Sequence, residues 1–146
     1  MPYSAMSDEE VHAFLTGRAR TAKLATTRAD GRPHLAPVWF GVEDDGAIVF
    51  NTGKETVKGR NLRHDPRVSL CIDDDVPPFS FVTIEGTAQV TEDPDPEELV
   101  ATAARIGGRY MGADRAEEFG RRNGVAGEMV VRVRPAKVVS AQDLAD

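Results

Sequence analysis

The run from Phe81 to Thr91 most constrains the fold, because its apolar and polar residues alternate with a period of two. Val82, Ile84 and Ala88 fall on one side of an extended chain, and Thr and Glu residues fall on the other. This alternation is typical of a strand with one buried face. Gly86 interrupts the apolar side, which predicts a bulge or a bend such as a barrel corner requires. The sequence therefore predicts a sheet that curves.

Other strand-like runs surround this one. The first two are separated by Asp30-Gly31 and the next two by Asp44-Asp45-Gly46, and both are hairpin turn signals. No regular alternation of strands and helices is present, which argues against a doubly wound parallel sheet. We expect one domain over residues 1–146, a small antiparallel barrel with peripheral helices. The other expected strands are Thr21–Thr27, His34–Val42, Ala47–Thr52, Val68–Ile72 and Glu128–Val139.

Helices are predicted at three places. Ser7 and Glu10 have the spacing of a capping box, so a first helix is expected over about Asp8–Arg18. A short helix is expected within the segment Thr52–Arg67. Pro96 follows an Asp-Pro-Asp turn and begins a third helical stretch, which continues as a glycine-punctuated segment to Gly124.

The segment Thr52–Arg67 is a basic island in an acidic protein. Its five Lys or Arg residues outnumber its two acids, while the whole chain has a formal net charge of -6. A compact basic island favours one small anion over a long nucleic acid, so we expect a phosphate site and no nucleic-acid partner. The start of a helix also favours anions. The five basic residues are Lys54, Lys58, Arg60, Arg63 and Arg67.

Three side chains in this island suit one phosphate. Thr56, Lys58 and Arg60 supply a hydroxyl, an ammonium and a guanidinium on a strand-to-helix turn. Gly59 between them permits a close approach of the backbone. The remaining basic residues are expected to pair with local acids: Lys54, Arg63 and Arg67.

Two further segments could contact a planar ligand. Pro37 lies within an expected strand and has no N–H to donate, so the strand has an edge or a bulge there. Trp39 shares its face and either lines the ligand or fills the core. Phe79 follows two prolines and either covers a flavin-type ring by stacking or enters the core. His34 is expected on the surface.

Several classes of site have no signal in this sequence. It contains no GxGxxG, P-loop, GxSxG, CxxC or HExxH pattern, and its three histidines lack metal-type spacing. We expect no metal and can assign no catalytic side chain, so a cofactor would carry any chemistry. No apolar run is long enough to span a bilayer. The acidic N-terminus and single cysteine, Cys71, favour the cytoplasm.

The stretches LATTRADGRPHLAPVWF, KGRNLRHDPRVSLCID and FVTIEGTAQV resemble the pyridoxamine-phosphate-oxidase-like split-barrel superfamily. The likeness covers roughly Leu24–Val90 and the last strand. Within the superfamily, the chain most resembles the small deazaflavin-dependent (coenzyme F420) oxidoreductases of actinobacteria. Its ending, VVSAQDLAD, lacks the Arg- and His-rich motif of pyridoxamine-phosphate oxidases, which argues against that substrate.

The resemblance implies a homodimer of six-stranded split barrels with two cofactor sites between the subunits. It implies hydride transfer from reduced F420 to an unsaturated organic acceptor. An FMN enzyme of the same fold and a non-catalytic cofactor-binding module are the alternatives. By the same resemblance, the residues that contact the phosphate are Thr56, Lys58 and Arg60, and Asn61 supports their turn. Asn51 and Thr52 line the groove. The ring lies along Pro37, Val38 and Trp39, and Phe79 covers it.

Overall fold

The computed structural model describes residues 4–145. Their seven strands form one antiparallel sheet in the order β2-β1-β5-β6-β7-β4-β3. The strands are β1 (Ala22–Thr27), β2 (Pro33–Val38), β3 (Gly41–Val42), β4 (Ile48–Gly53), β5 (Arg67–Asp74), β6 (Ser80–Thr91) and β7 (Glu128–Ala141). The helices are α1 (Asp8–Thr16), α2 (Val57–His64), α3 (Pro96–Met111) and α4 (Ala116–Asn123), with a short 3-10 turn at Ala113–Arg115.

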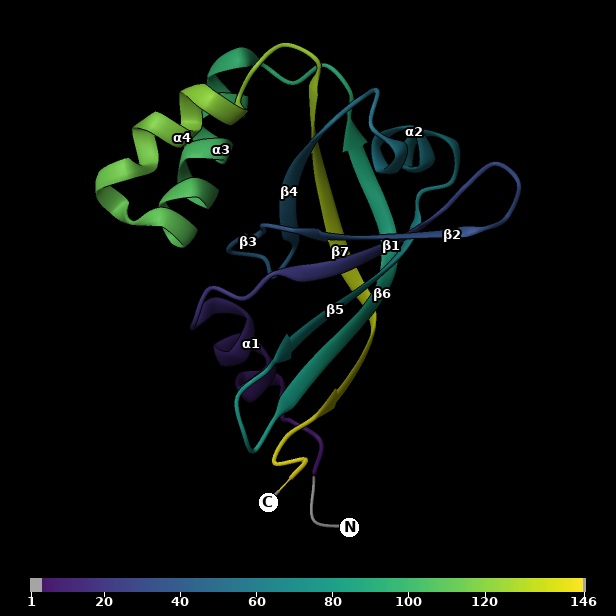
Figure 1. Cartoon of the computed structure of the whole chain (residues 1–146), viewed down its shortest axis with the longest axis vertical. Helices are drawn as coiled ribbons and strands as arrows, with labels where there is room; N and C mark the ends of the chain where they lie inside the picture. Colours follow the sequence, from purple (N-terminus) through teal and green to yellow (C-terminus); the bar gives the residue numbers. More distant parts are fainter. Residues whose placement is uncertain (1–3, 146) are drawn as a thin grey trace.

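The sheet curls into the expected split barrel. Strands β2 and β3 lie at opposite edges of the strand order, yet only two residues of chain separate them. A flat sheet cannot bring its two edges so close, and Figure 1 shows the strands wrapping around a common core. Inside this core lie large side chains with no exposed surface, among them Leu24, Phe40, Phe50, Leu70 and Ile84.

Six strands were expected and the described residues contain seven. The difference arises at Trp39 and Phe40, where the single expected strand His34–Val42 breaks into β2 and β3. At this break, two side chains of helix α3 form hydrogen bonds with the backbone groups of Phe40. The hydroxyl of Tyr110 accepts a hydrogen bond from the Phe40 N–H at 3.2 Å, and Arg109 donates to the Phe40 carbonyl at 2.9 Å. These groups are therefore unavailable to a neighbouring strand.

Strand β6 confirms the alternation seen in the sequence. Val82, Ile84 and Ala88 are buried, and the intervening residues are less so. The register with β7 shifts between Glu85 and Gly86, which confirms the predicted irregularity. A side chain at Gly86 would meet the carbonyl oxygen of Arg134 at 2.8 Å, so only glycine fits this bend.

The helices lie outside the barrel. Helix α1 has the predicted capping box but ends at Thr16, two residues earlier than expected. Helices α3 and α4 pack against each other at one side of the sheet (Figure 1). Their close approach explains the glycines of the segment, since a Cβ on Gly107 would lie 2.3 Å from that of Phe119.

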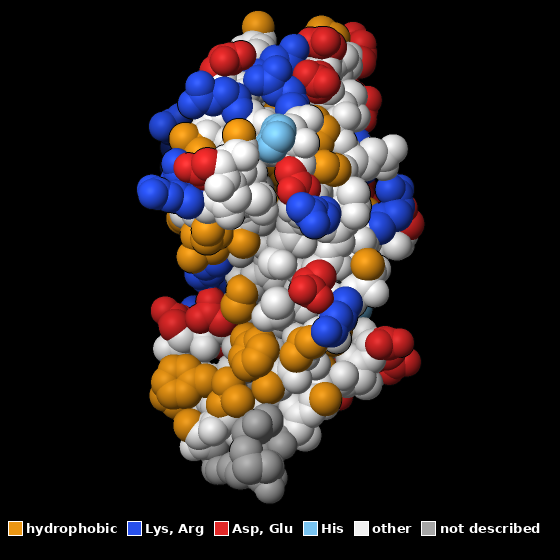
Figure 2. All heavy atoms as spheres, turned by 90° about the vertical axis from the view of Figure 1, so that its right-hand side faces the viewer, with side chains coloured by type: hydrophobic (Ala, Val, Ile, Leu, Met, Phe, Trp, Pro, Cys, Tyr) orange, Lys and Arg blue, Asp and Glu red, His pale blue; other side chains and the backbone are white. Residues whose placement is uncertain are grey.

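The surface is uneven in composition. Figure 2 shows many Lys and Arg side chains in the upper part of one face, at the level of α2 in Figure 1, and a gathering of hydrophobic side chains toward its lower end. Among residues 4–145, no helix combines the length and the apolar character needed to cross a membrane.

Candidate functional site

A cleft of about 200 Å³ brings together half of the residues predicted to bind the cofactor. It lies where the end of β2, strand β4, the start of α2, helix α3 and the start of β7 meet. The predicted residues that line it are Pro37, Val38, Trp39, Asn51 and Lys58. The other lining residues are Ala103 and Ile106 of α3, Asn123 of α4 and Glu128 of β7.

The turn between β4 and α2 places Lys58 at this cleft. Thr56 caps the helix: its hydroxyl accepts a hydrogen bond from the Gly59 N–H at 3.0 Å and donates to the Gly53 carbonyl at 2.8 Å. The first helical hydrogen bond runs from the Arg60 N–H to the Thr56 carbonyl. The N–H groups of Val57 and Lys58 therefore stay outside the helix's own hydrogen bonds, as donors for an anion.

The basic island divides into paired and unpaired cations. Lys54 pairs with Asp93, Arg63 lies 3.7 Å from both Glu55 and Glu92, and Arg67 lies 2.7 Å from Asp65. The hydrogen bond from Arg67 lowers the pKa of Asp65 to about 2. The expected pairing with local acids is confirmed for Arg63 and Arg67, whereas the acid that pairs with Lys54 is distant in sequence.

Lys58 and Arg60 form no ion pair with any acid in residues 4–145. Helix α2 has no acidic residue in its first turn. Lys58 is half-buried at the cleft, whereas Arg60 is exposed and does not line it. The charge available for an anion is therefore concentrated at the beginning of this helix.

Three predicted site residues do not line the cleft but stabilise the turn beside it: Thr52, Thr56 and Asn61. Thr52 is buried, and its hydroxyl lies 3.4 Å from that of Thr56. Asn61 is buried too, and its amide donates to the hydroxyl of Thr26 in β1 at 3.0 Å. Because its hydroxyl proton goes to the Gly53 carbonyl, Thr56 orients the turn in this structure. The close approach at Gly59 is to the same carbonyl, since a Cβ there would lie 2.0 Å from its oxygen.

Two aromatic side chains have distinct environments. Trp39 stacks on Tyr110 of α3 with ring centroids 4.9 Å apart, and it also contacts Phe119. It thus packs under the helices with one part and lines the cleft with another. Phe79 lies in the β5–β6 connection, at the opposite end of the sheet from α2 (Figure 1), and is 38% exposed. Within one chain it does not join the cleft, so its contact with a cofactor stays a prediction.

The sequence reasoning missed Glu128. Its carboxylate accepts a hydrogen bond of 2.7 Å from the Asn51 amide, and the two side chains share the cleft with Lys58. Burial raises the pKa of Glu128, and the Asn51 hydrogen bond and the charge of Lys58 offset part of that rise. Only the pairing of β7 with β4, which sets Glu128 opposite Gly53, could have indicated this position.

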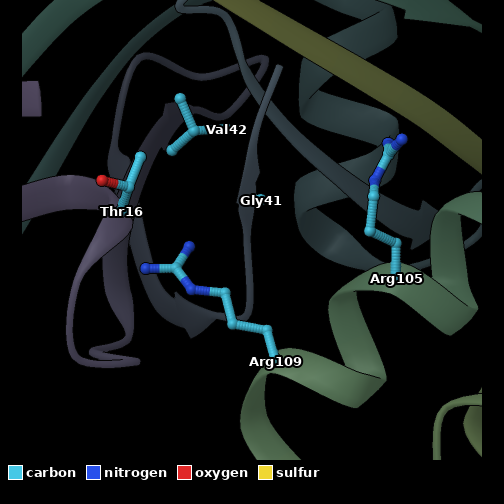
Figure 3. Close-up of a pocket in the computed structure, with 5 residues that line it drawn as sticks. All are labelled: Thr16, Gly41, Val42, Arg105 and Arg109. Atoms are coloured by element: carbon cyan, nitrogen blue, oxygen red, sulfur yellow. The ribbon is translucent and has the colours of Figure 1, made fainter. Parts of the chain in front are cut away.

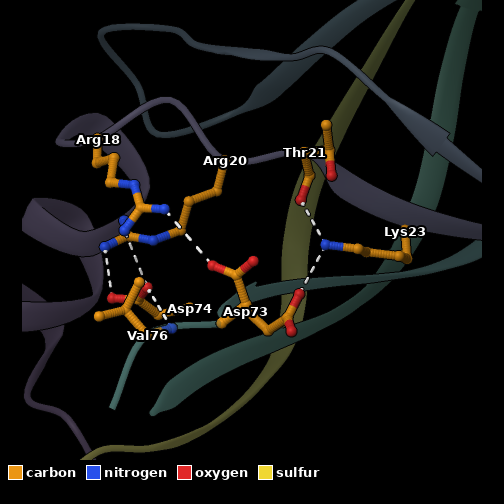
Figure 4. Close-up of polar contacts among 8 residues, drawn as sticks. Arg18, Arg20, Thr21, Lys23, Asp73, Asp74 and Val76 are labelled. Atoms are coloured by element: carbon orange, nitrogen blue, oxygen red, sulfur yellow. Dashed lines mark hydrogen bonds and ion pairs between the residues drawn. The ribbon is translucent and has the colours of Figure 1, made fainter. Parts of the chain in front are cut away.

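A second basic cluster lies around the start of β1 and is closed by acids (Figure 4). Arg18 and Arg20 both contact Asp74, at 3.1 and 3.2 Å, and Lys23 contacts Asp73 at 2.6 Å. Burial works to raise the pKa of Asp74, but its bonds to Arg20 and to the backbone lower the pKa below the ordinary value. The cations of this cluster are therefore neutralised by ion pairs within the chain.

A cavity of about 190 Å³ between α1, β3 and α3 is lined by two arginines that make structural contacts (Figure 3). Arg109 extends into it from α3 and donates to the carbonyls of Phe40 and Leu15. Arg105 pairs with Glu43 at 3.6 Å. These arginines fasten α3 to the sheet, so the cleft at Lys58 remains the candidate site.

Known proteins resemble this chain in sequence and in structure. A family model described as pyridoxamine 5'-phosphate oxidase matches residues 7–140. A 5a,11a-dehydrotetracycline/5a,11a-dehydrooxytetracycline reductase of Streptomyces rimosus is 35% identical over 74 residues, which are 46% of this chain and 52% of that protein. The chain spans about half the length of the curated relatives it matches, or less.

Two solved structures resemble most of the chain. The conserved hypothetical protein Rv2991 from Mycobacterium tuberculosis superposes with a TM-score of 0.79 at 31% identity, covering 97% of this chain and 89% of that one. A protein named F420 Reductase superposes with a TM-score of 0.67 at 25% identity, covering 86% of this chain and 94% of that one. These likenesses agree with the split barrel.

Proposed function

The chain belongs to the pyridoxamine 5'-phosphate oxidase family, and from this premise we propose that it is an F420-dependent oxidoreductase. The reaction would be hydride transfer from the reduced deazaflavin to an unsaturated organic acceptor of the quinone, enone or tetrapyrrole type. The observation that carries the proposal is Lys58, which lines the cleft without an acidic partner among the described residues. The similarity to an F420 reductase supports the choice of cofactor.

The cleft fits the phosphate end of such a cofactor. Lys58 supplies a charge, and the first turn of α2 supplies N–H groups, a combination that suits a phosphate. Its volume of about 200 Å³ is below the roughly 300–1,000 Å³ of pockets that enclose drug-sized ligands. The ring system would therefore extend beyond the cleft along Pro37, Val38 and Trp39, and a second wall would have to come from elsewhere.

A second copy of the chain is the proposed source of that wall. Strand β7 pairs with β4 only as far as Val133, so its continuation pairs with β6 alone. Residues 134–139 are all exposed, and they include Val138 and Val139 at 43% and 48%. A long exposed edge of this kind invites pairing with another chain. We infer a homodimer in which Phe79 of one subunit covers the ring held by the other.

The chain's own contribution would be binding and orientation. When bound, the cofactor supplies the hydride. Lys58 and the first turn of α2 would fix the phosphate, while Arg60 adds positive charge nearby. Pro37 has no N–H and is exposed on the last part of β2, so it offers a flat apolar contact. Holding donor and acceptor in a productive geometry can supply roughly 7–11 kcal/mol of the barrier. We also propose that the protein works in the reducing cytoplasm, as its single cysteine suggests.

An FMN enzyme of the same fold is the second candidate, because FMN presents a phosphate to the same residues. Titration of the purified protein with F420 and with FMN, followed by fluorescence, separates the two. We expect tighter binding of F420. A yellow protein that retains FMN through purification would favour the FMN enzyme instead.

Turnover distinguishes an enzyme from a cofactor-binding module. Reduced F420 is mixed with the protein and a panel of quinones, enones and tetrapyrroles, and its oxidation is followed by absorbance. We expect at least one acceptor to oxidise the cofactor in a protein-dependent way. Tight binding without oxidation by any acceptor would make the protein a storage or buffering module.

A further inference from the structure

Glu128 places a carboxylate in the cleft where the proposed function puts a phosphate. Its side chain passes over Gly53, since one carboxylate oxygen lies 3.0 Å from the position that a Cβ on Gly53 would take. The other oxygen accepts the 2.7 Å hydrogen bond from Asn51. Among the residues that the structure describes around the cleft, Glu128 is the single acid and Lys58 the single cation.

The surrounding charges leave Glu128 facing Lys58. From α2 comes Lys58, which forms no ion pair with Glu128. From the β6–α3 connection come Glu92 and Asp93, which share a neighbouring cavity of about 290 Å³ with Glu128. Both of these acids pair with cations of the island, Arg63 and Lys54 respectively. Strand β4 contributes the neutral Asn51, and α4 contributes Asn123, whose carbonyl also accepts from that amide.

We infer that binding of a phosphate-bearing cofactor beside Lys58 is coupled to proton uptake by Glu128. The inference rests on the proposed function of the cleft. A phosphate dianion and an ionised carboxylate in one small cleft repel each other, and the carboxylate can relieve the repulsion by taking a proton from solvent. No bond other than this O–H forms or breaks.

Burial independently brings Glu128 closer to protonation. It raises the pKa of the free protein's carboxyl above the ordinary value. A nearby anion raises it further, so the protonated form gains population when the phosphate binds. Cofactor affinity should consequently fall as the pH rises, beyond any change due to the ligand itself.

The test compares FMN binding, followed by flavin fluorescence, between about pH 5.5 and about pH 8.5. Wild type is compared with Glu128→Gln, which preserves the acceptor for Asn51, and with the control Glu9→Gln. Glu9 is exposed on α1, which lies toward the opposite end of the sheet from α2 (Figure 1), so its variant removes one negative charge away from the cleft. The FMN phosphate titrates near pH 6 in every sample, and this contribution cancels in the ratio of dissociation constants.

At the alkaline end we expect Glu128→Gln to bind FMN about tenfold more tightly than wild type, which corresponds to a pKa rise of one unit on binding. The difference should shrink toward the acid end, and Glu9→Gln should follow wild type throughout. A ratio of wild-type to Glu128→Gln affinities that stays constant with pH would overturn the inference. If Lys58→Ala binds FMN as tightly as wild type, the proposed function itself fails, which is a separate outcome.

Calorimetry gives a second measurement that needs no variant at Glu128. Heats of FMN binding to wild type near pH 7 are compared in two buffers with different ionisation enthalpies. At that pH the phosphate, with its second pKa of about 6, is already mostly ionised, so net proton uptake belongs to the protein. We expect uptake of a fraction of a proton. Zero uptake, or net release, would contradict the coupling.

Discussion

The molecule has two clusters of basic side chains beside its sheet, and only one of them is neutralised by the chain's own acids. Arg18, Arg20 and Lys23 contact the last two residues of β5, Asp73 and Asp74, and the following Asp75, at distances of 2.6–3.5 Å. Lys58 and Arg60 begin α2 and have no such partner among residues 4–145. The antiparallel pairing of β1 with β5 brings the first cluster close to its acids. A density of positive charge therefore does not by itself indicate a binding site. We propose the site at Lys58 because this lysine lines a cleft and forms no ion pair within residues 4–145.

The comparison predicts that the closed cluster supports stability and that the open one supports binding. The largest effect on stability is expected at Arg20, which is 13% exposed, bonds to Asp74 and the Phe14 carbonyl, and lies over the Phe14 ring at 4.0 Å. Arg20→Ala should lower the free energy of unfolding by roughly 2–3 kcal/mol, because charged hydrogen bonds and a cation–π contact are lost. Urea unfolding measures the loss.

Cofactor affinity of Arg20→Ala, measured where the protein is folded, should equal that of wild type. A loss of affinity as large as the loss of stability would mean that the two clusters are not functionally distinct.

A smaller effect is expected at the turn that presents Lys58. Thr56→Ala removes the cap of α2 and should lower stability by about 1 kcal/mol. Thr56→Ser keeps the hydroxyl and should retain most of it. Because Thr56 orients the turn, Thr56→Ala should also weaken cofactor binding. Thermal unfolding and a cofactor titration of both variants measure these effects. A serine variant that behaved like the alanine variant would contradict the role of the hydroxyl.

The smallest effects concern pH, and here the two regions should have opposite signs. The pKa of Asp74 is lowered, so its stabilising contribution is present above its ordinary value of 3.8 and is lost as the pH falls toward the lowered pKa. The pKa of Glu128 is raised, so its contribution is present below the ordinary value of 4.5 and is lost as the pH rises through the raised pKa.

Thermal unfolding of Asp74→Asn and Glu128→Gln between about pH 3 and about pH 8 measures both slopes. The asparagine variant should flatten the acid side of the profile, and the glutamine variant should flatten the side above pH 4.5. The same change of slope in both variants would contradict the opposite signs.

Local patterns in the sequence predicted most of the fold. The alternation in β6, the hairpin turns and the capping box each depend on neighbouring residues, and each is present in the structure. The break between β2 and β3 could not be predicted, because it depends on Tyr110 and Arg109, about 70 residues away. The role of Glu128 in the cleft depends on strand pairing and was missed for the same reason.

The candidate site was predictable in part. The spacing of Thr56 and Lys58 indicated the turn, and the structure gives that turn a cap and a cleft. The separation of paired from unpaired cations needed acids that are distant in sequence, such as Asp93 for Lys54. The contact of Phe79 with a cofactor ring stays a prediction, because Phe79 lies at the far end of the sheet and would need a second subunit to reach the cleft.

The most direct test removes one lysine from each cluster and measures cofactor binding. Lys58→Ala deletes the unpaired charge of the cleft, and Lys23→Ala deletes the charge that pairs with Asp73, so the two variants have equal net charge. Titration with F420 and with FMN should show a loss of about 10- to 150-fold for Lys58→Ala, the equivalent of one charge-assisted contact of roughly 1.5–3 kcal/mol. Lys23→Ala should bind like wild type. Equal affinities for Lys58→Ala and wild type would contradict the assignment of the phosphate site.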